Sequence, residues 1–253
     1  MSKNGVLVVT GGSRGIGAAT SLLAAERGWA VVVNYASSVE AAERVTAAIH
    51  AKGGEAIAVR GDVSQPEDVE HIFAAADRLG RVSGLVNNAG FGGPASALAG
   101  LTPERIAATF AVNVTGSFLC AAAAVKRMSI KSGGKGGAIV NVTSAAARIG
   151  GANMYLDYAA AKGAIDTFTV GLALEVAAEG IRVNAVRPGI IDTDFHSKSG
   201  DPGRAQRMAA AVPLGRPGTS EEVANGIVWL LSDEAAYATG SILDITGGRA
   251  VTA

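Results

Sequence analysis

The chain of 253 residues has little of what builds covalent cross-links, metal sites or charged surfaces. It contains one cysteine, Cys120, three histidines, and 22 basic against 22 acidic residues, so its net charge is zero. A single cysteine excludes an internal disulfide, and we expect Cys120 to fill space in the core. The basic residues are scattered, which argues against a nucleic-acid partner. The sequence offers no His/Cys cluster, so we expect no metal site.

Long apolar runs are also missing. No stretch reaches the ~18 apolar residues that predict a membrane span. The first residues, MSKNG, lead directly into an apolar strand without the h-region of a signal peptide. Charged residues make up 17% of the chain, below the usual ~25%. We therefore expect a soluble, cytoplasmic protein without a membrane partner.

Glycine, in contrast, is abundant, with 34 residues, and the chain is organised around the glycine-rich stretch 6–17. Its first residues, 6–9, are all aliphatic and predict a strand buried on both faces. Gly11, Gly15 and Gly17 then allow a sharp turn, and the residues that follow favour a helix. Backbone N–H groups and the helix dipole converge in such a turn, which makes it a candidate anion site.

The glycine turn alone leaves alternatives open. Its spacing, G-x-x-x-G-x-G, differs from the dinucleotide fingerprint G-x-G-x-x-G, and a tight turn without a ligand fits too. It also matches the G-x-S-x-G elbow of serine hydrolases, with Ser13 as nucleophile. That interpretation is weak, because His50 and His71 fall in or beside amphipathic helices and His196 falls in a polar loop. Ser13 also follows the first strand rather than a later one.

Strands and helices alternate along the rest of the chain. We expect further strands at 29–35, 55–60, 82–87, 138–143, 181–187 and 241–245, with helices near 39–52, 65–79, 102–128, 158–178 and 219–231. Thr102 is an expected helix cap, and capping boxes are expected at 64–67 and 219–222. The alternation predicts an α/β fold: one domain, 1–253, with a doubly wound parallel sheet of about seven strands and helices on both faces. The polar span 190–216 is an expected substrate lid.

Ligands of such sheets bind beyond the carboxyl ends of the strands. Ser144 follows the fifth expected strand, and Tyr158 and Lys162 lie one turn apart on the next helix. A hydroxyl, a phenol and an ammonium at one rim can perform acid–base chemistry on a carbonyl or an alcohol. We expect Lys162 to lower the pKa of Tyr158 from its usual ~10, and Ser144 to polarise the substrate oxygen.

Six motifs in order resemble the short-chain dehydrogenase/reductase family over nearly the whole chain. They are TGGSRGIG at 10–17, NNAG at 87–90, Asn113, Ser144, Tyr158 with Lys162, and Pro188-Gly189. The resemblance implies a Rossmann-like fold, an NAD(P)-dependent oxidoreductase, and a homotetramer or dimer assembled through the long helices and the last strand. It implies hydride transfer between nicotinamide and a ketone or a secondary alcohol.

The resemblance also implies residue roles. Tyr158 is the expected catalytic acid/base, and Lys162 is expected to hold the nicotinamide ribose. Ser144 orients the substrate oxygen, and Asn113 supports a proton relay through water. The expected cofactor-binding residues are Gly11, Ser13, Arg14, Gly15, Ile16, Gly17, Asn34, Tyr35, Ser37, Asp62, Val63, Asn88, Ala89, Gly90, Tyr158, Lys162, Pro188, Gly189, Ile191 and Thr193.

The sequence departs from the family pattern at one place. One extra residue separates Ser144 from Tyr158, in a loop expected to border the substrate. Strict spacing would put Ala145 at the serine position, but alanine has no hydroxyl. Thr143 is a weaker substitute for Ser144. Tyr155 competes with Tyr158 by proximity, but no lysine follows it four residues later.

The end of the second strand indicates which dinucleotide binds. Sites for NAD place an acidic residue there, to bind the ribose 2′-hydroxyl, whereas residues 34–38 contain none. Arg14 in the glycine turn could meet a 2′-phosphate. We predict NADP(H), with NAD(H) as the lesser cofactor. Related patterns occur in 3-oxoacyl-carrier-protein reductases and sugar dehydrogenases, and a non-catalytic NADP-binding regulatory or scaffold protein is the alternative.

Overall fold

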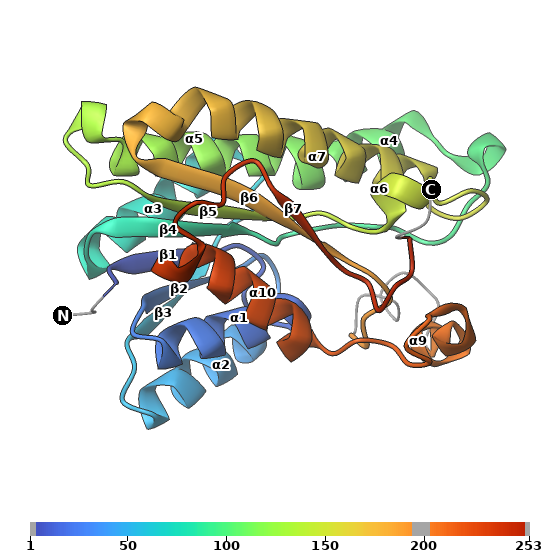
Figure 1. Cartoon of the computed structure of the whole chain (residues 1–253), viewed down its shortest axis with the longest axis horizontal. Coiled ribbons are helices and arrows are strands. Elements are labelled where there is room, and N and C mark those ends of the chain that lie inside the picture. The colour runs from blue at the N-terminus through green and yellow to red at the C-terminus, as the bar shows by residue number, and fades with distance from the viewer. Residues whose placement is uncertain (1–3, 194–202, 251–253) are drawn as a thin grey trace.

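Seven parallel strands form one sheet in the computed structural model, which describes residues 4–193 and 203–250 (Figure 1). The strands are β1 (Val6–Val9), β2 (Ala30–Tyr35), β3 (Ala56–Arg60), β4 (Val82–Asn87), β5 (Gly137–Val142), β6 (Ile181–Pro188) and β7 (Ile242–Ile245). They lie in the order β3-β2-β1-β4-β5-β6-β7. The chain changes direction across the sheet between β1 and β4, so the predicted seven-stranded, doubly wound sheet is confirmed and its switch point lies there.

Helices cover both faces of the sheet. They are α1 (Gly15–Glu26), α2 (Val39–Ala51), α3 (Pro66–Leu79), α4 (Pro103–Phe110), α5 (Gly116–Met128), α6 (Ala146–Ile149), α7 (Leu156–Val176), α9 (Arg204–Arg207) and α10 (Ser220–Leu231). Figure 1 shows α5 and α7 over one face and α1, α2 and α10 over the other. Along β1, Val6 and Val8 join one core while Leu7 and Val9 join the other. A strand buried on both faces needs the unbroken apolar run seen in its sequence.

Two of the three expected helix caps are confirmed. Thr219 and Glu222 form a reciprocal capping box at α10, and the Thr102 side chain accepts from the Arg105 N–H at α4. The box expected at 64–67 is wrong, because α3 begins after Gln65 with a proline at its first position. Ser64 instead turns back, and both its N–H and its hydroxyl donate to one carboxylate oxygen of Asp62.

The predicted helix near 102–128 is not one regular α-helix. A π-helical segment, Ala111–Thr115, separates α4 from α5. Among the described residues, Pro103–Met128 is the one stretch with the length and hydropathy of a membrane span, a test that core helices of soluble proteins also meet. Here α5 packs on β4, and Cys120 is completely buried, as expected. Burial raises the pKa of the Cys120 thiol to about 12.

The expected lid at 190–216 is described only in part, since 194–202, which include His196, lie outside the described residues. Before that gap, Ile191 forms an isolated parallel bridge with Gly218. After it, Ala205 of α9 and Val212, which follows that helix, form a small apolar cluster with Ile190. The described parts of this segment therefore pack on the main domain beside the carboxyl ends of the strands.

Candidate active site

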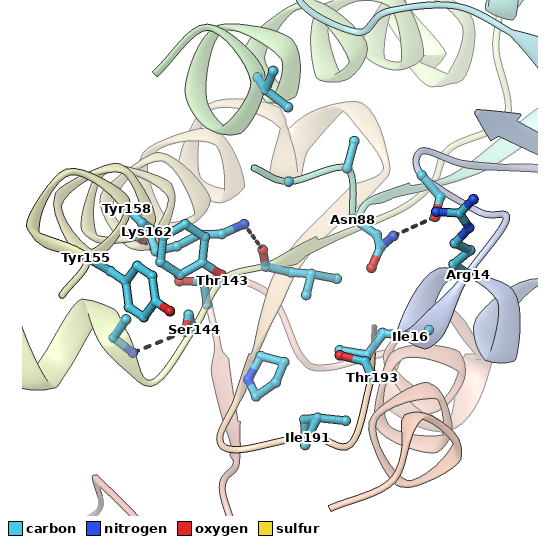
Figure 2. A pocket seen from close by; sticks show the side chains of 18 of the residues that line it. Arg14, Ile16, Asn88, Thr143, Ser144, Tyr155, Tyr158, Lys162, Ile191 and Thr193 are labelled. Carbon is cyan, nitrogen blue, oxygen red and sulfur yellow. Dashed lines mark hydrogen bonds between the residues drawn. The ribbon is translucent and has the colours of Figure 1, made fainter. Parts of the chain in front are cut away.

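The carboxyl ends of the strands open into one cavity of about 710 Å³ (Figure 2). Figure 2 shows Ser144, Tyr155, Tyr158 and Lys162 gathered on one side of this cavity, and Arg14, Ile16 and Thr193 on the other. Every expected cofactor-binding residue lines it except Gly17. The loops after β1, β2, β3, β4, β5 and β6 therefore meet in a single elongated site, as an open parallel sheet requires.

Gly17 lies behind the glycine turn, where it permits close packing. A Cβ atom on Gly17 would stand 2.3 Å from the Gly11 carbonyl oxygen and 2.5 Å from the Asn88 amide nitrogen. That amide donates to the carbonyl oxygens of Thr10 and Gly11, at 2.9 and 3.1 Å. The turn after β1 is thus fastened to the turn after β4, and any side chain at position 17 would separate them.

The N-terminus of α1 faces the cavity without a competing cap. Within the described chain, its N-cap residue Arg14 forms no side-chain cap and no acidic residue occupies its first turn. The Arg14 guanidinium reaches the loop between β2 and α2, where Nη2 donates to the Ser38 hydroxyl at 2.5 Å. A Cβ on Gly15 would lie 3.3 Å from Thr193 Cγ2, so Thr193 passes close over the turn. The turn offers N–H groups and a cation to an anionic ligand.

Asn34 and Asp62 line the cavity with their side chains engaged in the protein. The buried Asn34 side chain accepts from the Gly11 N–H at 3.2 Å and donates to the Gly61 carbonyl at 2.9 Å. Asp62 holds Ser64 through its carboxylate. Asn34 therefore ties β1, β2 and β3 together at the ligand end of the sheet, and Asp62 shapes the following turn.

Ser144 and Tyr158 form the polar edge at the other end. The Ser144 hydroxyl accepts from the Ala146 N–H at 3.1 Å and hydrogen-bonds to Tyr158. Burial raises the pKa of Tyr158 to about 12, and the hydrogen bond with Ser144 opposes that rise. The expected lowering of this pKa by Lys162 is wrong for the structure as it stands.

The Lys162 ammonium lies near the Tyr158 ring but is held by the main chain. Its ammonium donates to the Val142 carbonyl oxygen at 2.8 Å and lies 5.6 Å from the centroid of the Tyr158 ring. Burial lowers the pKa of Lys162 to about 8, while the carboxylate of Asp166 acts in the opposite direction. The side chains of Ser144, Tyr158 and Lys162 share one rim of the cavity, but the Lys162 ammonium is held by the main chain of β5.

Asn113 is buried in the π-helical segment and does not line the cavity. Its amide donates to the carbonyl oxygens of Phe91 and Thr109, at 2.7 and 2.8 Å. A Cβ on Gly90 would lie 3.1 Å from Asn113 Oδ1 and 3.8 Å from Lys162 Nζ. Asn113 and Lys162 therefore both lie next to Gly90, which brings the fourth expected catalytic residue close to Lys162.

The rivals of Ser144 and Tyr158 are placed differently. The buried Thr143 hydroxyl donates to the Lys162 carbonyl at 3.1 Å, which fixes the start of α7 to β5. Tyr155 does line the cavity, and its buried hydroxyl has no hydrogen-bond partner among the described residues. Ser144 thus lies at the rim despite the extra residue before Tyr158, and Tyr155 places a second phenol in the wall.

The sequence did not reveal a buried ion pair beside Tyr158. Arg105 on α4 contacts both carboxylate oxygens of Asp157, at 2.9 and 3.3 Å, and Thr109 donates to the same carboxylate at 3.1 Å. Burial acts to raise the pKa of Asp157, but hydrogen bonds from Arg105, the Tyr158 N–H and Thr109 lower it overall. Asp157 precedes Tyr158 directly, whereas Arg105 lies on another helix. No local sequence pattern therefore predicts this ion pair.

The hydrolase interpretation finds no histidine beside Ser13 among the described residues. Ser13 lines the cavity, but the exposed His50 ring lies at the start of β3, with Nε2 2.9 Å from the Ala56 carbonyl oxygen. His71 is exposed on α3. Over 4–193 and 203–250, no group of three or more His, Cys, Asp or Glu side chains is arranged to hold a metal ion.

A doubly wound sheet with a glycine turn at one end of its cleft and a Ser, Tyr and Lys set at the other is the architecture of a dinucleotide-dependent oxidoreductase. A family model described as enoyl-(acyl carrier protein) reductase matches residues 11–250. An uncharacterized oxidoreductase of Escherichia coli K12, YgfF, is 52% identical over 245 residues, covering 96% of this chain and 99% of that one.

Other relatives agree. A 3-oxoacyl-(acyl-carrier-protein) reductase of Synechocystis is 42% identical, covering 96% of each chain. The crystal structure of a dehydrogenase/reductase from Sinorhizobium meliloti 1021 superposes with a TM-score of 0.90 at 31% identity, covering 100% of this chain and 96% of that one. The chain belongs to the short-chain dehydrogenase/reductase family of oxidoreductases.

Proposed function

We propose that the protein is an NADP(H)-dependent oxidoreductase that transfers hydride between nicotinamide and a carbonyl or secondary alcohol of a small molecule. One observation carries the proposal: Ser144, Tyr158 and Lys162 line one end of the same cavity that the glycine turn and Arg14 line at the other. A non-catalytic NADP-binding protein of this fold would need the turn, but it would have no use for a Tyr and a Lys buried together at the rim.

The residues present fit a bound NADP(H). The open N-terminus of α1 suits the diphosphate, and Arg14 with Ser38 suits a 2′-phosphate, because a guanidinium makes strong, charge-assisted bonds to phosphate. Lys162 would hold the nicotinamide ribose, and Thr193 the carboxamide. When bound, the nicotinamide supplies or accepts the hydride.

The chain itself supplies proton transfer and orientation. Ser144 holds the substrate oxygen, and Tyr158 donates a proton to that oxygen during reduction or removes one during oxidation. A pKa of about 12 keeps Tyr158 protonated at neutral pH, so the resting site is prepared for reduction. Asn113 and Lys162 lie next to the backbone of Gly90. In this proposal a water-mediated relay through them returns a proton to Tyr158 after it has donated one to the substrate.

We also propose the oligomeric state and the cellular location that are expected from the family resemblance. One domain, 1–253, works in the cytoplasm as a homotetramer, and the segment 190–216 borders the substrate. Its partner is a small ketone or alcohol rather than a nucleic acid or a membrane. The name of the Synechocystis relative refers to a 3-oxoacyl group, a ketone that this site could also accommodate.

The test is turnover of a panel of ketones and secondary alcohols, followed by NADPH or NADH absorbance. We expect kcat/KM to be at least about tenfold higher with NADPH than with NADH. Loss of a charge-assisted contact in Arg14→Ala should lower kcat/KM for NADPH by about 10- to 100-fold and leave NADH nearly unchanged.

Arg44→Ala, on the exposed side of α2, is the matched control and should change neither value. A clear preference of the wild-type protein for NADH would contradict the NADP(H) assignment. A purified chain that binds NADPH but turns over nothing on the panel would favour the non-catalytic alternative.

A further inference from the structure

A row of charged side chains lies behind Lys162. Asp166 follows Lys162 by one turn of α7, so the two side chains lie on the same side of the helix. The Asp166 carboxylate accepts from Arg187 Nη2 at 2.7 Å, and Arg187 Nη1 donates to Asp244 at 2.8 Å. The part of the cavity wall that the structure describes includes neither Asp166 nor Arg187 nor Asp244. These three side chains are therefore placed behind the site rather than in it.

The row joins α7 to the last two strands of the sheet. Helix α7 packs on β6 (Figure 1), and Arg187 on β6 is paired in register with Asp244 on β7. The Arg187 side chain is 6% exposed, so its two ion pairs lie largely out of water. Burial acts to lower the pKa of Arg187, but hydrogen bonds with Asp166 and Asp244 raise it overall. Arg187 is thus a fixed cation that holds the Asp166 carboxylate.

Stability alone does not explain this arrangement. Replacing a buried ion pair by apolar side chains of similar volume is often neutral or stabilising. In addition, Asp166 Oδ1 and Arg187 Nε are buried without hydrogen-bond partners among the described residues. An unpaired buried polar atom costs free energy and calls for a reason. The carboxylate at position 166 therefore has a use other than packing.

The surroundings of Lys162 suggest that use. Its ammonium is buried and donates to a neutral group, the Val142 carbonyl oxygen. Burial lowers the pKa of Lys162 to about 8, and the Asp166 carboxylate opposes that fall. Tyr158 is the titratable group on the other side, with its ring centroid 5.6 Å from Lys162 Nζ. Its pKa of about 12 leaves it uncharged where Lys162 titrates.

Neighbouring charges are engaged away from Lys162. Strand β5, residues 88–90 and the π-helical segment 111–115 carry no charged side chain. The other charged side chains of α4, α6, α7, the turn after α7 and β6 are exposed or bonded to other groups: Glu104, Arg105, Arg148, Asp157, Glu175, Glu179 and Arg182. Asp166 is thus the carboxylate of these elements that serves Lys162.

We propose that Asp166 is a positioning residue that keeps the Lys162 ammonium charged, and that Arg187 and Asp244 hold its carboxylate in place for this role. Asp166 acts through Lys162 and touches no ligand. The loss of an anion beside an ammonium favours the neutral amine, whereas the loss of a nearby cation favours the ammonium. The assignment rests on the proposed function for the role of Lys162 in the reaction.

The direct test is an NMR titration of Lys162 in protein made with isotope-labelled lysine, because the Cε shift changes when the ammonium loses its proton. The Lys162 signal is identified by its absence in Lys162→Arg. In the wild-type protein without cofactor we expect a midpoint at about pH 8. Asp166→Asn should lower that midpoint by at least about 0.5 pH unit, and Arg187→Gln should raise it.

Two further variants control for structural effects. Asp166→Glu retains the carboxylate and should keep the midpoint near that of the wild type. Glu175→Gln, at an exposed position of the same helix, should leave it unchanged. An unchanged midpoint in Asp166→Asn, or an equal fall in Asp166→Glu, would overturn the assignment. The Asp166 variants decide the question even where Arg187→Gln does not fold.

The same variants separate this assignment from the proposed function. In carbonyl reduction, the pH at which kcat/KM falls should move with the NMR midpoint, downward in Asp166→Asn and upward in Arg187→Gln. The predicted NMR shifts in a protein that reduces no ketone would support this assignment and contradict the proposed function. Ketone reduction by a protein whose Lys162 midpoint does not respond to Asp166→Asn would support the proposed function and overturn this assignment.

Discussion

Tyr158 and Lys162 occupy surroundings that oppose the charged form of each. Burial raises the pKa of the phenol to about 12 and lowers that of the ammonium to about 8. Both groups are therefore protonated at neutral pH, and the lysine is the one that titrates near the physiological range. The phenol can donate a proton at once, whereas the positive charge next to it is lost first as pH rises.

The pH profile of carbonyl reduction should reflect that order. We expect kcat/KM to be nearly constant from about pH 6 to 7 and to fall as the pH passes about 8, where Lys162 loses its proton. Lys162→Arg keeps the charge, because a guanidinium titrates above ~12, so its profile should fall at least about one pH unit higher. An identical fall in both proteins would assign the titration to another group.

That Ser144, Tyr158 and Lys162 lie at one rim could be predicted from sequence, but their electrostatics could not. The spacing of Tyr158 and Lys162 places them on one helical face, and the motif order singles out Ser144. The direction of the Lys162 ammonium depends on the Val142 carbonyl, on a neighbouring strand. No pattern in the sequence predicts that this carbonyl accepts a hydrogen bond from the Lys162 ammonium.

At the scale of elements, the first turn of α7 is anchored to α4. The Asp157 side chain is completely buried and that of Arg105 is 14% exposed, so their ion pair lies almost wholly out of water. The anchor holds the turn that carries Tyr158. Thr109 connects it to Asn113, because the Thr109 carbonyl accepts from the Asn113 side-chain amide. Removing one member leaves a buried charge without its partner.

Breaking this pair should cost far more stability than breaking a surface pair. Arg105→Leu should lower the free energy of unfolding by about 3 kcal/mol, measured by urea denaturation at fixed protein concentration. Lys52→Met, which breaks an exposed pair with Glu26, should cost less than about 1 kcal/mol. Arg105→Leu combined with Asp157→Leu should recover part of the loss. Equal costs for the two single variants would show that the pair does not anchor the turn.

Local capping signals predicted helix starts where the partners lie within three residues. Thr102 and Thr219 behave as their sequences indicate. Ser64 does not, because the Asp62 carboxylate competes for its donors and Pro66 sets the start of the helix. The Arg105–Asp157 pair shows the other limit, since it depends on how two helices cross.

At the scale of the whole molecule, the alternating pattern was sufficient to predict the sheet, because every central strand is buried on both faces. Some apolar residues nevertheless remain exposed. Phe118 on α5 stacks on Phe168 of α7, with ring centroids 3.8 Å apart, and Leu174 on the same helix is 79% exposed. Exposed apolar side chains along two adjacent long helices are suited to contact with another copy.

The proposed homotetramer predicts a solution mass about four times the 25.2 kDa of the chain, measured by light scattering after size exclusion. Leu174→Glu should shift the protein to a smaller species, because a carboxylate is costly in an apolar interface. Leu98→Glu, at a leucine that is 69% exposed in the loop before α4, should leave the mass unchanged. A monomeric wild-type protein would contradict the assembly.

Single-turnover reduction with bound NADPH tests the central claim most directly. A ketone substrate is mixed with the NADPH complex, and the loss of NADPH absorbance is followed in the wild-type protein and in Tyr158→Phe. A general acid contributes about 10²- to 10⁴-fold to the rate, so we expect Tyr158→Phe to lose at least about 100-fold in rate while its Kd for NADPH stays within about twofold. An unchanged rate in Tyr158→Phe would contradict the account.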